Sequence, residues 1–205
     1  MDSPNRTGRL IVISGPSGVG KSTVVRRLIE SCPLPLKLSV SATTRPRREN
    51  EVDGRDYHFL TEDQFRDRIE RGEFLEYVEV FGGGFWYGTL KKEVTTGLEQ
   101  GKWIILEIDV EGAAKILPQF PQAITVFIHP GNLAELERRL KGRGSENPDS
   151  LARRLDAARR ELDAANQYKH IVVNDTVDRA VEEICQILKQ YAEHPQGDPS
   201  ECTKN

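Results

Sequence analysis

The length and composition are those of an ordinary soluble globular protein that folds as one domain, with or without inserted subdomains. The chain has 205 residues, of which 37% are hydrophobic and 30% charged, and its formal net charge is −3. This charge gives no sign of a nucleic-acid-binding protein. No apolar run approaches the roughly 20 residues that cross a bilayer, and no apolar signal core follows Met1. We therefore expect a cytoplasmic protein.

The cysteines indicate neither a disulfide framework nor a zinc site. Cys32, Cys185 and Cys202 are odd in number and widely spaced, and no CxxC motif or close Cys/His pair accompanies them. We expect reduced thiols.

A Gly-rich segment near the N-terminus, residues 15–22, matches the phosphate-loop pattern G-x-x-x-x-G-K-[ST]. The pattern predicts a strand over residues 9–14 before this phosphate loop and a helix over residues 23–30 after it. Glycines let backbone N–H groups converge on an anion, and the helix N-terminus adds partial positive charge. In such a loop Lys21 reaches the β- and γ-phosphates, and Ser22 offers its hydroxyl to Mg²⁺. The residues predicted to bind the nucleotide here are Gly15, Pro16, Ser17, Gly18, Val19, Gly20, Lys21, Ser22 and Thr23.

The next segments are a strand and a long polar loop. Residues 36–41 alternate in polarity and predict a strand. Residues 43–57, the arginine loop, are charged, turn-rich and too long for a simple connector. Several arginines close to Tyr57 suit a phosphate that is held from several sides. On composition alone, a solvated charged loop is the simpler interpretation.

The remainder of the chain alternates between predicted strands and helices. In order, they are a helix over 61–69, strands within 73–87 joined at Gly82–Gly84, a helix over 90–99, a strand over 103–109, a strand over 123–128, a helix over 132–141, an Arg-rich helix over 151–165, a strand over 170–173 and a helix over 177–191. This alternation predicts an α/β fold with a parallel sheet covered by helices on both faces. Ligands of such sheets bind at the carboxyl ends of the strands.

Several motifs in the same order resemble those of guanylate kinases. The run Ser41-x-x-Thr44-Arg45-x-x-Arg48-x-x-Glu51-x-x-Gly54-x-x-Tyr57-x-Phe59 looks like the nucleoside-monophosphate-binding signature of that family. The similarity extends from about Leu10 to Leu188. It includes Tyr87-Gly88-Thr89, Leu106-Glu107-Ile108-Asp109-x-x-Gly112, Arg139-Leu140-x-Gly142-Arg143-Gly144 and Val173-Asn174-Asp175.

The resemblance implies the P-loop nucleoside-monophosphate kinase fold in a single domain, residues 1–205. The implied parts are a parallel-sheet core (about 9–40, 90–135 and 170–192), a β-rich GMP-binding subdomain (about 41–89), a helical lid (about 136–169) and a disordered tail (193–205).

The resemblance also implies an enzyme: Mg²⁺-dependent phosphoryl transfer from ATP to GMP or dGMP, which recycles GMP and supplies GTP and dGTP. The implied phosphate-binding residues for GMP are Arg45, Arg48, Tyr57 and Tyr87, and those around guanine are Ser41, Glu76, Thr89 and Asp109. The implied catalytic cations are Lys21, Arg48, Arg139, Arg143 and Arg154. Asn174 resembles a residue near the adenine of ATP, although it could equally be a turn residue. We expect no nucleic-acid or membrane partner, and the sequence does not set the oligomeric state.

The acidic residues support this interpretation chemically. Guanine presents adjacent N1–H and N2–H₂ donors that one carboxylate can accept together, and Glu76 suits that role. Glu107 and Asp109 are two residues apart on a strand and share a face near its carboxyl end. We assign Asp109 mainly to guanine and Glu107 to Mg²⁺ through water, although a solvated strand-end acid is an equally good interpretation of Glu107.

Two other functions are consistent with parts of this pattern. One is a non-catalytic guanylate-kinase-like module that binds proteins, although such modules lack a working phosphate loop. The other is a related P-loop kinase for another phosphorylated acceptor, which would lack the base-reading Glu. The chain also departs from the family in a longer turn, residues 81–88, which could shift Tyr87 and Thr89.

Overall fold

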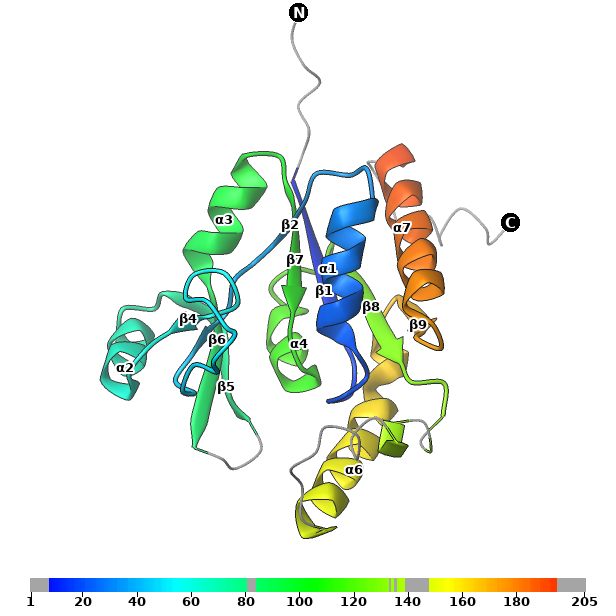
Figure 1. Cartoon of the computed structure of the whole chain (residues 1–205). Coiled ribbons are helices and arrows are strands. Elements are labelled where there is room, and N and C mark those ends of the chain that lie inside the picture. The colour runs from blue at the N-terminus through cyan, green and yellow to red at the C-terminus, as the bar shows by residue number, and fades with distance from the viewer. Residues whose placement is uncertain (1–7, 81–83, 133, 135, 139–147, 195–205) are drawn as a thin grey trace, which may run out of the picture. The chain divides into compact units, whose positions relative to one another are not determined.

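The computed structural model describes residues 8–80, 84–132, 134, 136–138 and 148–194 (Figure 1). The chain forms two compact units. Unit 1 comprises Met1–Ile13 and Pro35–Thr125, and unit 2 comprises Ser14–Leu34 and Val126–Asn205.

Unit 1 contains three parallel strands in the order β2-β7-β1. They are β1 (Arg9–Ser14), β2 (Leu36–Leu38) and β7 (Trp103–Glu107). Side chains on both faces of β1 and β7 are buried, which explains their nearly continuous Val, Ile and Leu runs. The predicted strand over 36–41 is correct in place but too long, because β2 ends at Leu38.

A second sheet of unit 1 has the order β4-β3-β6-β5. Its strands are β3 (Ala42–Thr43), β4 (His58–Phe59), β5 (Phe74–Val80) and β6 (Phe85–Leu90). Its core centres on Phe65, whose ring stacks on Phe74 with centroids 4.4 Å apart. The β5–β6 pairing is antiparallel and sets Glu76 opposite Thr89 and Val78 opposite Tyr87. The longer turn therefore leaves these two pairings of the hairpin intact.

The described residues of unit 1 form three helices: α2 (Glu62–Glu70), α3 (Lys91–Glu99) and α4 (Val110–Ile116). The capping box predicted for α2 is present, since Thr61 and Gln64 bond each other's backbone N–H groups. Helix α4 was not predicted, because its seven residues are too few to show a helical period. The residue that could have indicated the start of this helix is Asp109, which is its N-cap.

Unit 2 contains α1 (Lys21–Ser31), the parallel strands β8 (Ile124–His129, which begins in unit 1) and β9 (His170–Val173), and the segments α6 (Pro148–Asp163), η1 (Ala164–Gln167) and α7 (Val177–Glu193). Ala134 and residues 136–138 are helical, in agreement with the predicted helix over 132–141 as far as the description extends. The last turn of the predicted Arg-rich helix is the separate 3-10 segment η1. The predicted tail lies outside the described residues from 195 onward. No helix in the described ranges is long and apolar enough to span a membrane.

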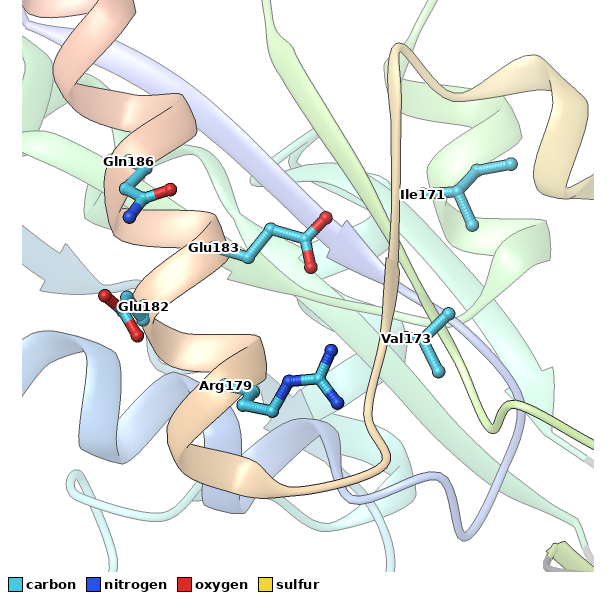
Figure 2. Close-up of a pocket in the computed structure, with 6 residues that line it drawn as sticks. All are labelled: Ile171, Val173, Arg179, Glu182, Glu183 and Gln186. Carbon is cyan, nitrogen blue, oxygen red and sulfur yellow. The ribbon is translucent and has the colours of Figure 1, made fainter.

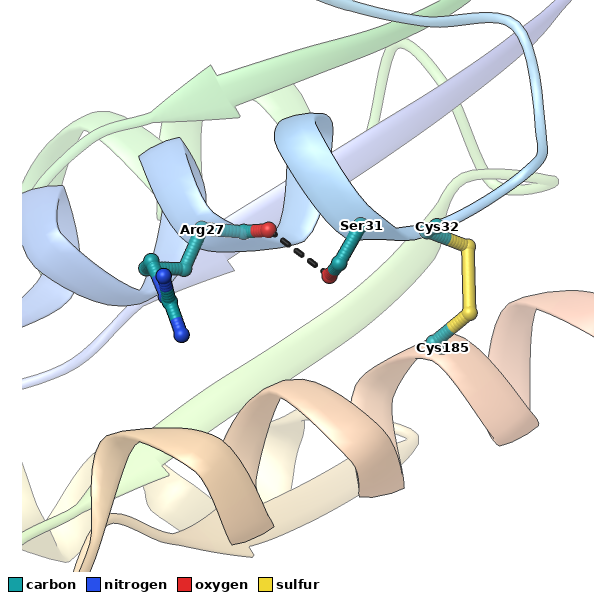
Figure 3. The surroundings of a disulfide bond; sticks show 4 residues. All are labelled: Arg27, Ser31, Cys32 and Cys185. Carbon is teal, nitrogen blue, oxygen red and sulfur yellow. Dashed lines mark hydrogen bonds between the residues drawn. A yellow bond between two sulfur atoms is a disulfide. The ribbon is translucent and has the colours of Figure 1, made fainter.

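The expectation of reduced thiols is wrong for two of the three cysteines. Cys32 and Cys185 form a disulfide between the end of α1 and the middle of α7, with Cα atoms 5.8 Å apart (Figure 3). The packing of α1 against α7 brings them together, although 153 positions separate them in sequence. Sequence spacing alone could not reveal such a pair. Cys202 lies outside the described residues.

The disulfide yields a test of stability. Replacing both cysteines by Ser (Cys32→Ser with Cys185→Ser) removes a cross-link that restricts the unfolded chain. We expect the free energy of unfolding to fall by about 2–5 kcal/mol, measured by urea denaturation without reductant. Cys202→Ser is the control and should match the wild type. Three free thiols in the unreduced native protein would contradict the disulfide.

Candidate functional site

The phosphate loop in unit 2 has a backbone that favours glycine at three positions. Gly15, Gly18 and Gly20 have φ values of 144°, 85° and 96°, all in the region that L side chains rarely adopt. A Cβ at Gly15 would lie 2.3 Å from the carbonyl oxygen of Ile128, and a Cβ at Gly20 would lie 2.9 Å from Asn174 Nδ2. The pattern of the sequence therefore corresponds to a loop that only glycine can form at these points.

Polar groups of the phosphate loop form hydrogen bonds with other groups of the same chain. Lys21 Nζ donates to the carbonyl oxygens of Gly15 (2.6 Å) and Pro16 (3.2 Å). The backbone N–H of Ser17 donates to Glu161 Oε2 of α6 at 3.2 Å. A carboxylate therefore accepts from one N–H group of the loop, which is the kind of acceptor that such backbone groups favour. Ser22 and Thr23 are exposed in the first turn of α1.

Asn174, directly after β9, is bonded to the phosphate loop. Its side chain is buried with 2% exposure, and Nδ2 donates to the carbonyl oxygen of Val19 at 2.7 Å. Its backbone N–H donates to His129 at 2.8 Å. Asn174 therefore connects the end of β9 to the loop, a role that the sequence pattern did not indicate.

The arginine loop in unit 1 gathers three of the predicted phosphate-binding residues. Arg45 Nε donates to Tyr87 Oη at 3.2 Å, and the guanidinium carbon lies 5.6 Å from the ring centroid of Tyr57. The rings of Tyr57 and Tyr87 pack edge-on, 5.8 Å apart. Burial, followed by the charge of Glu107, raises the pKa of Tyr57 to about 12, so its hydroxyl stays a donor at neutral pH. Arg48, the fourth residue, has an exposed side chain.

A second group in unit 1, the carboxylate cluster, consists of Glu76, Thr89, Asp109 and Gly112. Thr89 Oγ1 donates to Glu76 Oε1 at 2.6 Å across the β5–β6 pair, and Glu76 is only 5% exposed. Asp109 Oδ1 accepts from the backbone N–H of Gly112 at 2.7 Å. A Cβ at Gly112 would lie 3.0 Å from Glu76 Oε2, so glycine there gives space to that oxygen.

Burial raises the pKa of the Glu76 carboxyl, and the Thr89 hydrogen bond only partly offsets it. The nearby charge of Asp109 raises this pKa further, and Lys115 lowers it. Ser41 lies half-buried just before β3, and its carbonyl oxygen accepts from the His58 N–H at 2.9 Å. Thr89 and Tyr87 are two residues apart on β6 and therefore share one face of the strand.

The two predicted metal-environment residues are placed separately. Ser22 is the second residue of α1 in unit 2, and Glu107 is half-buried at the end of β7 in unit 1, where its charge acts on Tyr57. The described part of the chain has no group of three His, Cys, Asp or Glu side chains that could hold a metal. Mg²⁺ in phosphotransferases needs few protein ligands, because substrate phosphates and water complete its shell. The Ser22 hydroxyl and the Glu107 carboxylate are oxygen groups of the kind that Mg²⁺ binds, directly or through water.

The predicted lid arginines are only partly described. Arg139 and Arg143 lie outside the described residues, and Arg154 lies within α6.

A cavity of about 460 Å³ opens between β9 and α7 and is lined by Ile171, Val173, Arg179, Glu182, Glu183 and Gln186 (Figure 2). None of these residues was predicted to bind a nucleotide.

Comparison with known proteins gives consistent matches. The family model for guanylate kinase matches residues 7–191. A guanylate kinase of Rhodopirellula baltica is 49% identical over 206 residues, covering 100% of this chain and 96% of the relative. One of Caldanaerobacter subterraneus is 45% identical, covering 91% of this chain and 89% of the relative. The crystal structure of guanylate kinase from Anaplasma phagocytophilum matches with a TM-score of 0.74 and 31% identity, covering 92% of this chain and 87% of that one.

The contact between Asn174 and the phosphate loop gives a test of the loop. Asn174→Ala removes the hydrogen bond to Val19, so the loop loses a fixed support. We expect the Kd for a nucleoside triphosphate to rise about ten-fold, measured by calorimetry, since such a bond contributes about 1–2 kcal/mol. Asn166→Ala, at an exposed position of η1, is the matched control. An unchanged Kd in a folded Asn174→Ala protein would show that the bond does not matter for binding.

Proposed function

The chain belongs to the guanylate kinase family, and from this premise we propose that it transfers the terminal phosphoryl group of ATP to GMP, giving ADP and GDP. The phosphate loop supplies the donor site and the arginine loop with the carboxylate cluster supplies the acceptor site. Neither the non-catalytic binding module nor the kinase for another phosphorylated acceptor has support. The phosphate loop retains Lys21 and Ser22, and the acceptor side retains Glu76.

The buried carboxylate of Glu76 is the observation that carries this proposal. Thr89 satisfies Oε1 only in part, and Gly112 leaves space beside Oε2. A buried carboxylate is costly unless donors pair with it. The N1–H and N2–H₂ groups of guanine are two adjacent donors, whereas adenine offers no such pair. The site therefore favours GMP over AMP by leaving the carboxylate underpaired when the wrong base binds.

The phosphate of GMP fits the arginine loop. Arg45 supplies a guanidinium, and the hydroxyl groups of Tyr57 and Tyr87 lie beside it. Arg48 adds an exposed cation from the same loop. Since dGMP carries the same base and the same phosphate as GMP, we propose it as a second acceptor.

Catalysis by these residues consists of positioning and charge stabilisation. The acceptor oxygen of GMP is ionised at neutral pH, so no general base is needed. Lys21 exchanges its bonds to Gly15 and Pro16 for the phosphates of ATP. The arginines Arg48, Arg139, Arg143 and Arg154 stabilise the charge of the transferring group, and lid closure excludes water.

Mg²⁺ is the proposed cofactor. The Ser22 hydroxyl would bind it, with Glu107 acting through water. When bound, the ion neutralises charge on the donor phosphates. Asn174 supports the donor side through its hydrogen bond to the phosphate loop, and its position near the adenine of ATP remains a proposal from the resemblance.

We also propose a cytoplasmic location, where ATP and GMP are abundant. The Cys32–Cys185 bond would then be an exception, because disulfides are rare in reducing compartments. Cell fractionation tests the location, and recovery of the protein outside the cytoplasmic fraction would contradict it.

The assigned role of Glu76 predicts a selective defect. Glu76→Gln replaces one acceptor oxygen by an NH₂ donor that opposes the donors of guanine. We expect the KM for GMP to rise about 100-fold or more, with the KM for ATP within about two-fold of wild type. A coupled assay of ADP formation measures both constants. Equal loss for both substrates would refute base reading by Glu76, and no GMP phosphorylation by the wild type would refute the function.

The raised pKa of Glu76 predicts the pH dependence of base binding. Only the ionised carboxylate accepts both guanine donors, so the Kd for guanosine should rise as pH falls, starting above the ordinary glutamate pKa of 4.5. The free energy of unfolding has the opposite pH dependence. The folded state holds the Glu76 proton more tightly than the unfolded chain does. The stabilisation from this proton is therefore present at acid pH and is lost as pH rises through the raised pKa.

Guanosine is the appropriate ligand for this titration, because it lacks a phosphate that titrates in the same range. Calorimetry from about pH 5 to about pH 8 measures the Kd. The Glu76→Gln variant should give a flat profile. A wild-type profile that is flat over this range would contradict the role of the ionised carboxylate.

A further inference from the structure

We propose that Glu51 is a positioning residue that holds Arg45 in place for the phosphate of the acceptor nucleotide. This inference rests on the proposed function, because it assigns Arg45 to that phosphate. Glu51 itself does not touch the substrate.

The Glu51 carboxylate joins two points of the arginine loop. Arg45 Nη2 donates to Glu51 Oε1 at 2.8 Å and to Oε2 at 3.0 Å. The backbone N–H of Arg48 donates to Oε2 at 2.8 Å. In return, the backbone N–H of Glu51 donates to the Arg48 carbonyl oxygen at 3.1 Å. One side chain therefore fixes both the guanidinium of Arg45 and the backbone at Arg48.

The remaining contacts of Arg45 complete its orientation. Nε donates to Tyr87 Oη at 3.2 Å, and Nη1 donates to the Pro46 carbonyl oxygen at 2.7 Å. Every guanidinium nitrogen thus donates to a protein acceptor, so the plane of the group is set. Its carbon also lies 5.6 Å from the ring centroid of Tyr57 and 5.8 Å from that of Phe59.

The Arg45–Glu51 ion pair is largely shielded from solvent. The side chains of Arg45 and Glu51 are 13% and 18% exposed. Hydrogen bonding from Arg45 lowers the pKa of Glu51, so the carboxylate is charged throughout the neutral range. An arginine held in one rotamer before the ligand arrives loses less side-chain entropy on binding a phosphate. Glu51 therefore improves phosphate affinity although it carries the same sign of charge as the ligand.

The loop provides a matched control. Glu49 is an acid two residues away, with an exposed side chain that makes no hydrogen bond or ion pair in the part of the chain that is described. Glu49→Gln changes the net charge as much as Glu51→Gln does. A difference between the two variants therefore reports the contacts of Glu51 and not the charge of the loop.

The test compares GMP with guanosine, which carries the same base without the phosphate. In Glu51→Gln we expect the Kd for GMP to rise about ten-fold, with the Kd for guanosine within about two-fold of wild type. The KM for GMP should rise while kcat at saturating GMP stays close to wild type. Glu49→Gln should match the wild type, and Glu51→Asp, which keeps the charge on a shorter stem, should recover part of the loss.

Three results would overturn the proposal. They are an unchanged Kd for GMP, tighter GMP binding, which would make Glu51 a competitor of the phosphate, and equal losses for GMP and guanosine, which would indicate general damage to the subdomain. If Glu51→Gln fails to fold, the same comparison with Glu51→Asp decides. A wild-type protein that does not phosphorylate GMP would refute the proposed function instead, and phosphate-dependent binding would still test Glu51.

Discussion

The burial of the Glu76 carboxylate is the constraint on which the acceptor side of this protein depends. A charge removed from water needs fixed partners, and the β5–β6 register supplies one by setting Thr89 opposite Glu76. The absence of a side chain at Gly112 leaves space for the second oxygen. The strand pairing and the N-terminus of α4 therefore shape the surroundings of one buried carboxylate. In the proposed function, a ligand with two adjacent donors completes its hydrogen bonds.

The residues proposed for the two nucleotides belong to different parts of the chain. The residues assigned to GMP, together with Glu51, belong to unit 1, whereas the phosphate loop, α6 and Asn174 belong to unit 2. In both units, charged side chains are held by the protein itself. Arg45 is bonded to Glu51, Lys21 to carbonyl oxygens of its own loop, and the Ser17 N–H to Glu161. Substrate phosphates then replace or join contacts that are already ordered, which limits the entropy lost on binding.

The sequence predicted the features that depend on local chemistry. The phosphate loop follows from glycines at positions with positive φ, and the start of α2 follows from Thr61 and Gln64. The strands β1 and β7 follow from buried apolar runs. The acceptor residues came from the family resemblance, because on composition alone a solvated surface loop is the simpler interpretation of these arginines. Contacts then placed Arg45 with Tyr57 and Tyr87.

Features that depend on distant pairs were not predictable in this way. The Cys32–Cys185 bond requires α1 to pack on α7, and the Asn174 bond requires β9 to end at the phosphate loop. The part played by Glu51 requires its carboxylate to turn back toward Arg45 and Arg48. In each case the sequence gives the type of the residue but does not give the residue that it contacts, because the tertiary fold determines that contact.

The proposed specificity depends on acceptance of two donors of the base by the Glu76 carboxylate. The most direct test is the kcat/KM for GMP against that for IMP, whose base retains N1–H but lacks the 2-amino group. We expect the wild type to prefer GMP by about ten-fold or more and Glu76→Gln to lose most of this preference. Equal use of GMP and IMP by the wild type, or an undiminished preference in Glu76→Gln, would contradict it.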